Sequence, residues 1–492
     1  MDIANISADE LKREITATER KLQRLKVQLA NVEAQNDHNN ELEQQLEVAE
    51  SRWRLLPEEY QRYGRQMVVP KIGIQGQLHL RSASVLIVGV GGLGCPAAAY
   101  LAGAGIGKIG LVDGDIVELS NLHRQIIHNN STIGMFKVDS AYRYLKQSVL
   151  ISLDIIIISG TILIKIRLNP LCQYITYATP LTPQNAENIV SAYDLILDCT
   201  DHPISRYLIS DIGLLLQKPV ISASALRSEG QLLLLNWPPL SVGNEAGGPC
   251  YRCIFPKSPP AESVVSCGDG GIIGPVVGLM GVLQAVEALK LLVGGNLVNS
   301  ISNKKAETKS TMFMFSANSE PQFRTVKLKG RRKECRTCSN QNVITLEKLR
   351  NGNIDYEHFC GILPSLTVML DDKDRLQPNQ FARQLDEGVE HLLVDVREKI
   401  HFDICSLPGS INVPISKLQS LCAQKVRDCK KLEWLPEPLS PQVPIYIICR
   451  SGNDSQIATK LLKEMGLQQI VKNIDGGFKA WRKQVDPTWP EY

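Results

Sequence analysis

The stretch from Ser84 to Lys137 constrains the fold more than any other part of the sequence. An apolar run over residues 85–88 leads into a glycine-rich turn, and an alanine-rich segment over residues 97–104 follows. This order predicts a strand, a turn and a helix beginning near Pro96, as in nucleotide-binding βαβ units. Glycines let backbone amides approach a phosphate, and the helix dipole favours the same anion. The glycines of this turn are Gly89, Gly91, Gly92 and Gly94.

Charged side chains after this unit indicate which nucleotide it binds. Leu111 and Val112 are predicted to form the next strand, which ends in Asp113, a carboxylate placed to bind ribose hydroxyls. Taken alone, the glycine pattern is typical of a dinucleotide-dependent dehydrogenase. Arg124 and Lys137, however, supply two cations that suit a triphosphate and its transfer, so we favour ATP over NAD. The other residues predicted to contact ATP in this segment are Ser120, Asn121, Leu122 and His123.

At these residues the chain resembles the ubiquitin-activating-enzyme superfamily, in particular the bacterial-type branch that adenylates sulfur-carrier proteins. The matching motifs are Arg62-Tyr63-Gly64-Arg65-Gln66, the glycine turn, Asp113-Gly114-Asp115, Asn121 to Gln125, Gly134 to Lys137 and Asp198-Cys199-Thr200-Asp201. The resemblance implies a Rossmann-like α/β adenylation domain that uses ATP and Mg²⁺.

The resemblance also assigns roles to three further residues. It implies that Asp201 holds Mg²⁺ and takes part in catalysis. The next residue is usually asparagine in the family, and His202 departs from that pattern while staying in the predicted ATP site. Arg65 matches an arginine that reaches the ATP of the neighbouring subunit, which implies a homodimer. Without the motif around it, a surface arginine would simply be solvated.

Composition bounds the class of protein. With 492 residues, 43% of them hydrophobic, the chain can hold two or three domains. Its net charge of +3 gives no reason to expect nucleic-acid binding. The first fifty residues are strongly polar and carry no secretion signal, so we expect a cytosolic protein with no membrane association. The 13 cysteines would then be reduced, and cysteine pairs would bind metal or act in catalysis.

Two CxxC pairs predict a metal site. The ligands would be Cys250, Cys253, Cys335 and Cys338. Four thiolates at this paired spacing form a closed tetrahedral site for a structural Zn²⁺, whereas the alternative is that some are buried free cysteines. Between the pairs, Cys267 stands in a glycine-rich loop before a predicted helix over residues 276–291. It resembles the carrier-accepting cysteine of the family, although a lone thiol is more often structural.

An apolar segment over residues 149–166 departs from the family pattern. Its length approaches that of a membrane span, but Asp154 and Lys165 interrupt it in the middle of a soluble domain. We interpret it as an insertion without functional residues, such as retained non-coding sequence, and expect its deletion to raise soluble yield without reducing adenylation. Before the adenylation domain, residues 1–52 carry apolar positions at helical spacing and predict either a short coiled coil or a solvated helix.

A second α/β domain is predicted over residues 376–492, after an adenylation domain over 53–338 and a linker over 339–375. Its strand around residues 443–448 ends in Cys449, and an amphipathic helix follows. This loop resembles the active loop of rhodanese sulfurtransferases, in which backbone amides, a helix dipole and here Arg450 would stabilise a persulfide on the catalytic cysteine. A cysteine-dependent phosphatase is disfavoured because its arginine stands at the end of the loop, not directly after the cysteine.

The fusion of both domains resembles the eukaryotic adenylyltransferase and sulfurtransferase family of molybdenum cofactor synthesis, which also serves tRNA 2-thiolation. The resemblance implies ubiquitin-like sulfur carriers as partners, namely the molybdopterin synthase small subunit and a ubiquitin-related modifier. It further implies a persulfide donor such as a cysteine desulfurase, with Cys449 passing sulfur to the adenylated carrier. The alternative is a ubiquitin-like conjugation enzyme whose rhodanese domain only binds, against which the intact Cys449 loop argues.

Overall fold

A computed structural model describes residues 53–146, 168–259, 270–295, 310–360, 370–423, 434–436 and 439–492. The chain divides into two compact units, from Met1 to Gly361 and from Ile362 to Tyr492. The predicted N-terminal helix, the whole apolar segment and Cys267 lie outside the described residues.

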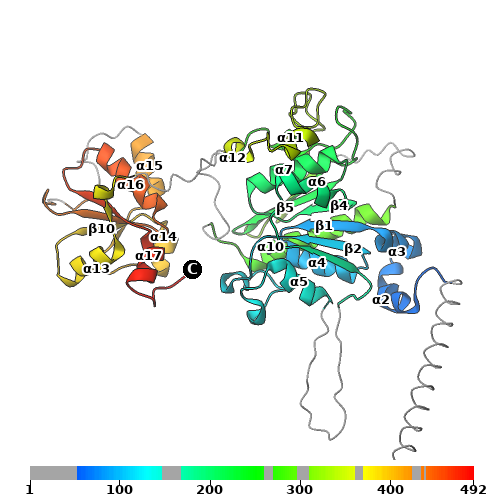
Figure 1. Ribbon diagram of the computed structural model, residues 1–492, viewed down its shortest axis with the longest axis horizontal. Coiled ribbons are helices and arrows are strands. Elements are labelled where there is room, and N and C mark those ends of the chain that lie inside the picture. The colour runs from blue at the N-terminus through cyan, green and yellow to red at the C-terminus, as the bar shows by residue number, and fades with distance from the viewer. Residues whose placement is uncertain are drawn as a thin grey trace, which may run out of the picture. The chain divides into compact units, whose positions relative to one another are not determined.

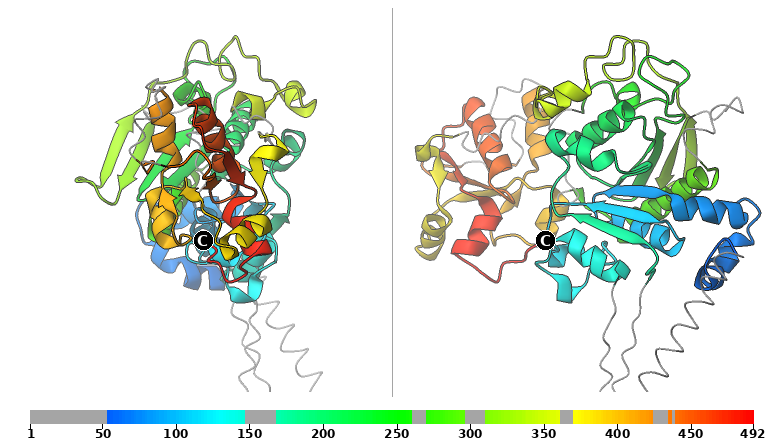
Figure 2. Two further views of the ribbon diagram at one scale, coloured as in Figure 1. Left: turned by 90° about the vertical axis from the view of Figure 1, so that its left-hand side faces the viewer. Right: turned by 45° about the vertical axis from the view of Figure 1, so that its right-hand side comes forward.

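The first unit is built on an eight-stranded sheet (Figure 1). Its strands are β1 Ser84–Val88, β2 Lys108–Val112, β3 Gln173–Tyr177, β4 Leu195–Asp198, β5 Val220–Leu226, β6 Glu229–Leu235, β7 Thr311–Ser316 and β8 Phe323–Lys327. They lie in the order β3-β2-β1-β4-β5-β6-β7-β8. The first five are parallel, whereas β6, β7 and β8 pair antiparallel. The β7–β8 hairpin projects from the edge of the sheet (Figure 2).

The order in which successive strands are added to the sheet reverses between β1 and β4: β2 and β3 lie on one side of β1, and β4 and β5 lie on the other. Val85 pairs with Ile109 of β2 on one side and with Leu195 of β4 on the other. Every residue of β1 is buried, as its continuous apolar run requires of a central parallel strand. In an open parallel sheet, ligands bind outside the carboxyl ends of the strands at such a reversal. The topology therefore places the predicted glycine turn at the expected ligand site.

Helices cover both faces of this sheet, with α4, α5 and α10 on one side and α6 and α7 on the other (Figure 1). The helices of the unit are α2 Pro57–Met67, α3 Gly73–Ser82, α4 Gly94–Gly103, α5 Lys137–Lys146, α6 Pro183–Val190, α7 Pro203–Leu215, α8 Tyr251–Ile254, α10 Gly274–Val293, α11 Leu346–Arg350 and α12 Tyr356–Phe359. Within the described ranges, α10 alone is long and apolar enough to cross a membrane. It is a core helix, because its buried Gln284 donates to the carbonyl oxygens of Asp198 and Ile221 on the sheet.

The stretch predicted as a linker contains structured parts. Arg350 of α11 forms an ion pair with Glu187 of α6, and Tyr356 of α12 donates to Asp211 of α7. Residues 339–360 therefore belong to the first unit.

The second unit has a five-stranded parallel sheet in the order β11-β10-β12-β13-β9. Its strands are β9 Arg375–Leu376, β10 Leu392–Asp395, β11 Ile411–Asn412, β12 Ile445–Ile448 and β13 Val471–Ile474, and its helices are α13 Pro378–Asp386, α14 Lys399–Ile404, α15 Ile415–Ala423, α16 Asn453–Glu464 and α17 Gly477–Gln484. Separate apolar cores fill the two faces of the sheet. The central strand β12 ends directly before Cys449, so the cysteine lies at the carboxyl edge of the sheet.

Candidate active sites and metal centre

A cleft of about 1260 Å³ opens at the carboxyl ends of β1, β2 and β4. It is the place where a Rossmann-like sheet binds a nucleotide. Many of the residues predicted from the sequence line it together, although they come from separate segments of the chain. These residues are Gly89, Gly91, Gly92, Asp113, Asn121, Arg124, Lys137 and Asp201.

Close backbone packing explains the glycines at both ends of the turn. Gly89 has φ +93°, and a Cβ there would lie 2.7 Å from the carbonyl oxygen of Cys199. A Cβ on Gly94 would lie 2.0 Å from the carbonyl oxygen of Gly89. The first glycine therefore permits the left-handed turn, and the last permits α4 to start against β1. Gly94 packs against Gly89, which lines the cleft, and does not line the cleft itself.

The backbone of Val90, inside the turn, is hydrogen-bonded through both its N–H and its carbonyl oxygen. Its amide donates to Asp113 Oδ2 at 2.7 Å, and its carbonyl oxygen lies 3.0 Å from His128 Nε2. His128 Nδ1 accepts from Ser140 of α5, and burial lowers the pKa of this imidazole, which keeps it neutral. Asp113 Oδ1 also accepts the amide of Asp115, while burial raises the pKa of the Asp113 carboxyl. Asp113 thus fixes the turn in addition to facing the cleft.

The two predicted cations approach the cleft from different segments. Lys137 is buried at the start of α5, and its Nζ lies 2.8 Å from Oδ2 of the exposed Asp115. Arg124 is half-buried and donates to the carbonyl oxygen of Ser120 at 2.8 Å. Both residues line the cleft with the glycine turn, so an entering triphosphate would compete for their present partners. Asp201 is exposed at the cleft wall and makes no hydrogen bond or ion pair with the described part of the chain.

Five of the predicted residues do not line the cleft: Arg65, Ser120, Leu122, His123 and His202. His123 contacts the guanidinium of Arg124, which ties it to a residue that does line the cleft. His202 is the N-cap of α7, where its Nδ1 accepts the amide of Ile204 at 3.3 Å. Its position in the family motif therefore coincides with a helix-capping contact. Arg65 is exposed on α2.

Sequence reasoning missed two arginines that line the cleft. Arg206 lies in the first turns of α7 and donates to the carbonyl oxygen of Thr200 at 2.8 Å. Its nearness to Asp201 at a helix start was a signal available in the sequence. Arg227 lies between β5 and β6 with φ +55°, and its backbone exchanges hydrogen bonds with Gly271 and Ile273. No local sequence pattern predicts that Arg227 lines the cleft, because its backbone partners come from a distant segment.

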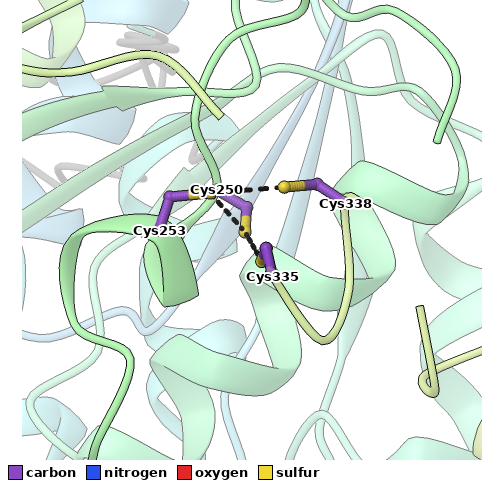
Figure 3. A group of neighbouring side chains, drawn as sticks. All are labelled: Cys250, Cys253, Cys335 and Cys338. Carbon is purple, nitrogen blue, oxygen red and sulfur yellow. Dashed lines mark hydrogen bonds between the residues drawn. The ribbon is translucent and has the colours of Figure 1, made fainter. Parts of the chain in front are cut away.

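The four predicted metal ligands meet in space. Figure 3 shows their side chains pointing toward one another, with all four Sγ atoms within 4.8 Å of each other. Zn–S bonds of about 2.3 Å would place tetrahedral sulfurs about 3.8 Å apart, so the spacing fits a metal of that size. The Sγ atoms of Cys250 and Cys335 are 3.4 Å apart, and those of Cys253 and Cys338 are 3.2 Å apart. The sequence prediction of the donor set is therefore consistent with the geometry.

Cys449 lies at the start of a tight loop before α16. Its Sγ accepts the amide of Gly452 at 3.1 Å and lies 3.5 Å from Ser455 Oγ. Gly452 has φ +92°, and a Cβ on Gly477 would lie 2.2 Å from the Cys449 carbonyl oxygen, so glycines allow the loop to close. The loop amide is directed at the sulfur as predicted. Burial nevertheless dominates and raises the pKa of the Cys449 thiol.

Charged and aromatic groups surround this loop. Arg450 donates to the backbone oxygen of Tyr492 and lies with its guanidinium 5.4 Å from the Tyr492 ring. Asp395, the last residue of β10, and Arg397 form a buried bidentate pair. The Arg397 guanidinium stacks on Phe478 of α17 at 4.1 Å. This pair joins β10 to the helix that supports the Cys449 loop.

Comparison with known proteins identifies both units. The ThiF family matches residues 63–155 and 166–337, and the rhodanese-like domain matches residues 377–484. The adenylyltransferase and sulfurtransferase uba4 of Aspergillus fumigatus is 49% identical over 510 residues, covering 98% of this chain and 98% of that protein. The protein of the same name in Pyricularia oryzae is 46% identical, with 100% of each chain covered. The chain belongs to this family of adenylyltransferases and sulfurtransferases.

The family assigns an activity to each unit. The chain is an enzyme, an adenylyltransferase in its ThiF unit and a sulfurtransferase in its rhodanese-like unit. Adenylation requires ATP, and the glycine-turn cleft is where a nucleotide binds in such a fold. Among solved structures, E. coli MccB with MccA-N7isoASN aligns over 57% of this chain and 75% of that chain, with TM-score 0.43 and 18% identity. PaaA aligns over 56% and 74%, with TM-score 0.40 and 22% identity.

Proposed function

We propose that this enzyme adenylates the C-terminal glycine of ubiquitin-like sulfur carriers and then converts it to a thiocarboxylate. The carriers would be the molybdopterin synthase small subunit and a ubiquitin-related modifier, for molybdenum cofactor synthesis and tRNA wobble-uridine 2-thiolation. The observation that carries the proposal is the presence in one chain of the nucleotide cleft and the Cys449 loop. We place the enzyme in the cytosol, because the cysteines in the described part of the chain are free and CxxC pairs of free cysteines are typical of a reducing compartment.

The first reaction uses the cleft. A carboxylate oxygen of the carrier attacks the α-phosphorus of ATP, the bond to the β-phosphate oxygen breaks, and pyrophosphate leaves from an acyl adenylate. Arg124 and Lys137 are the side chains that would stabilise the developing negative charge. Asp201 would hold Mg²⁺, since its carboxylate is exposed at the cleft wall and oxygen is the ligand that Mg²⁺ prefers. The bound ion would screen the phosphate charge.

The second reaction uses Cys449. A persulfide donor such as a cysteine desulfurase loads sulfur onto its Sγ, and the terminal sulfur attacks the carrier carbonyl carbon while AMP leaves. The resulting acyl disulfide is cleaved when a second thiol attacks Cys449 Sγ, which releases the thiocarboxylate. Cys267 is the candidate for that thiol by its family motif. A cellular thiol would then reduce the disulfide between the two cysteines.

The cysteine cluster would hold a structural Zn²⁺ through Cys250, Cys253, Cys335 and Cys338. Four thiolates saturate a tetrahedral ion, so we assign it no catalytic role. We also propose a homodimer. Arg65 is exposed and does not line the cleft of its own chain, which supports a role at the cleft of a second copy.

The test is pyrophosphate exchange into ATP by the purified full chain. We expect exchange only when a carrier ending in Gly-Gly is added. Asp201→Ala should abolish exchange because the Mg²⁺ ligand is lost, whereas Cys449→Ala should leave exchange intact because adenylation precedes sulfur transfer. Loss of exchange in Cys449→Ala would refute the assignment of two separate sites.

A trapping assay separates this function from a conjugation enzyme with a non-catalytic rhodanese-like unit. Incubation with a sulfur donor should leave one extra sulfur on Cys449, detected by mass spectrometry of the peptide. Cys267→Ala should keep that loading and the exchange activity yet form little thiocarboxylate. An unloaded Cys449 would favour the conjugation enzyme.

A further inference from the structure

Asp211, on α7, is completely buried and contacts a residue from the turn of each of the two cysteine pairs. Its Oδ1 accepts Arg252 Nε at 3.1 Å and Thr337 Oγ1 at 2.8 Å. Its Oδ2 accepts Arg252 Nη2 at 2.9 Å and the hydroxyl of Tyr356 at 2.9 Å. A buried carboxylate is tolerated only when it is paired and hydrogen-bonded, and these donors satisfy that requirement.

Two of the donors occupy the same place in the two metal-binding turns. Arg252 is the third residue of the turn from Cys250 to Cys253, and Thr337 is the third residue of the turn from Cys335 to Cys338. Both reach Asp211 Oδ1. One carboxylate oxygen therefore connects two turns that are separated by 85 residues in the chain.

The guanidinium that completes this connection is itself held in place. Arg252 is buried and stacks between aromatic rings, 4.3 Å from the centroid of Phe359 and 4.7 Å from that of Tyr207. Asp211 in turn belongs to the buried face of α7. Each of the two cysteine turns is therefore attached to α7 through Asp211, in addition to any contact between the turns themselves.

We propose that Asp211 is the positioning residue of the metal centre, and that its carboxylate holds both CxxC turns at the separation that four-thiolate coordination requires. The proposal rests on the metal site in the proposed function. Without this connection, bringing two distant turns together would cost conformational entropy at the moment of metal binding. Groups that orient metal ligands commonly change metal affinity by about 10- to 100-fold when removed.

A matched pair of variants tests the proposal. Thr337→Val and Tyr356→Phe each delete one hydrogen bond to Asp211 of nearly equal length, but Thr337 lies in a cysteine turn and Tyr356 lies on α12. We expect Thr337→Val to raise the zinc dissociation constant about 10-fold or more and Tyr356→Phe to change it less than about 3-fold. Thr337→Ser keeps the hydroxyl and should restore wild-type affinity.

The measurement is zinc competition with a chromogenic chelator on the full chain, alongside urea unfolding of each variant. A merely structural role would weaken zinc binding equally in Thr337→Val and Tyr356→Phe, or in neither, and either result overturns the proposal. Asp211→Asn should weaken binding most, and the matched pair remains decisive where that variant does not fold. Wild-type protein without zinc by metal analysis would instead refute the metal site itself.

Discussion

At the scale of residues, Gly94 supports the nucleotide cleft through contact with the carbonyl oxygen of Gly89. Gly94→Ala would place a Cβ 2.0 Å from that oxygen, so α4 or the turn must shift. We expect unfolding free energy to fall by about 1–3 kcal/mol and pyrophosphate exchange to be lost. Gly103→Ala in the same helix is the control, because its Cβ meets nothing within 4 Å. Equal effects of the two variants in urea unfolding and exchange assays would contradict this role.

Cys449 shows a second residue-scale effect, the raised pKa of a buried thiol. The ultraviolet thiolate signal that Cys449→Ser removes should titrate with a midpoint above the usual value near 9. Ser455 lowers this pKa by hydrogen bonding, so Ser455→Ala should move the midpoint further up, whereas the exposed Ser451→Ala should not. The folded state holds this proton more tightly than the unfolded state, so stability should decline as pH rises through about 9. A midpoint below about 9 would contradict the dominance of burial.

At the scale of elements, α10 is joined to the sheet by one polar side chain. Gln284 Nε2 donates to the carbonyl oxygens of Asp198 and Ile221, on β4 and β5, at 2.8 and 3.0 Å. Gln284→Leu should lower unfolding free energy by about 1–3 kcal/mol, because the strand carbonyls lose buried donors. Lys290→Ala on the same helix removes an exposed ion pair and should change it by less than about 0.5 kcal/mol. Denaturant unfolding with a similar loss in both variants would show that Gln284 makes no special contribution.

At the scale of the whole molecule, the boundary of the second unit lies before the position that the sequence suggested. Arg375, in the short edge strand β9, pairs with Asn473 and forms an ion pair with Asp475. A fragment over residues 376–492 lacks that ion pair, and it lacks Asp374, the partner of Lys463.

Fragment 376–492 should therefore unfold about 5–10 °C below fragment 362–492, as followed by circular dichroism. Fragment 370–492 keeps β9 and both ion pairs, so it should match the longer fragment. Sulfur loading of Cys449 should survive in all three, since its loop contacts are local to the unit. Identical midpoints for 376–492 and 362–492 would show that β9 does not stabilise the unit.

The amino-acid sequence by itself determined the two α/β units, the glycine turn and which four cysteines meet in space. Each of these features follows from a pattern of residues that are close together in the chain. The patterns are an apolar strand followed by glycines, a CxxC spacing, and a cysteine followed by a helix. Such patterns are readable because backbone geometry and ligand chemistry act over a few residues. The limits of the linker could not be predicted as well, because α11 and α12 are too short to show a helical period of apolar residues.

Only the tertiary structure decided which distant groups act together. The sequence could not indicate that Asp211 joins both cysteine turns, that Arg227 lines the nucleotide cleft, or that His128 holds the peptide of Val90. It also could not show that burial outweighs the loop amide at Cys449. Burial, hydrogen-bond partners and pKa shifts depend on what the fold packs around a side chain, and those neighbours come from segments that no local pattern connects.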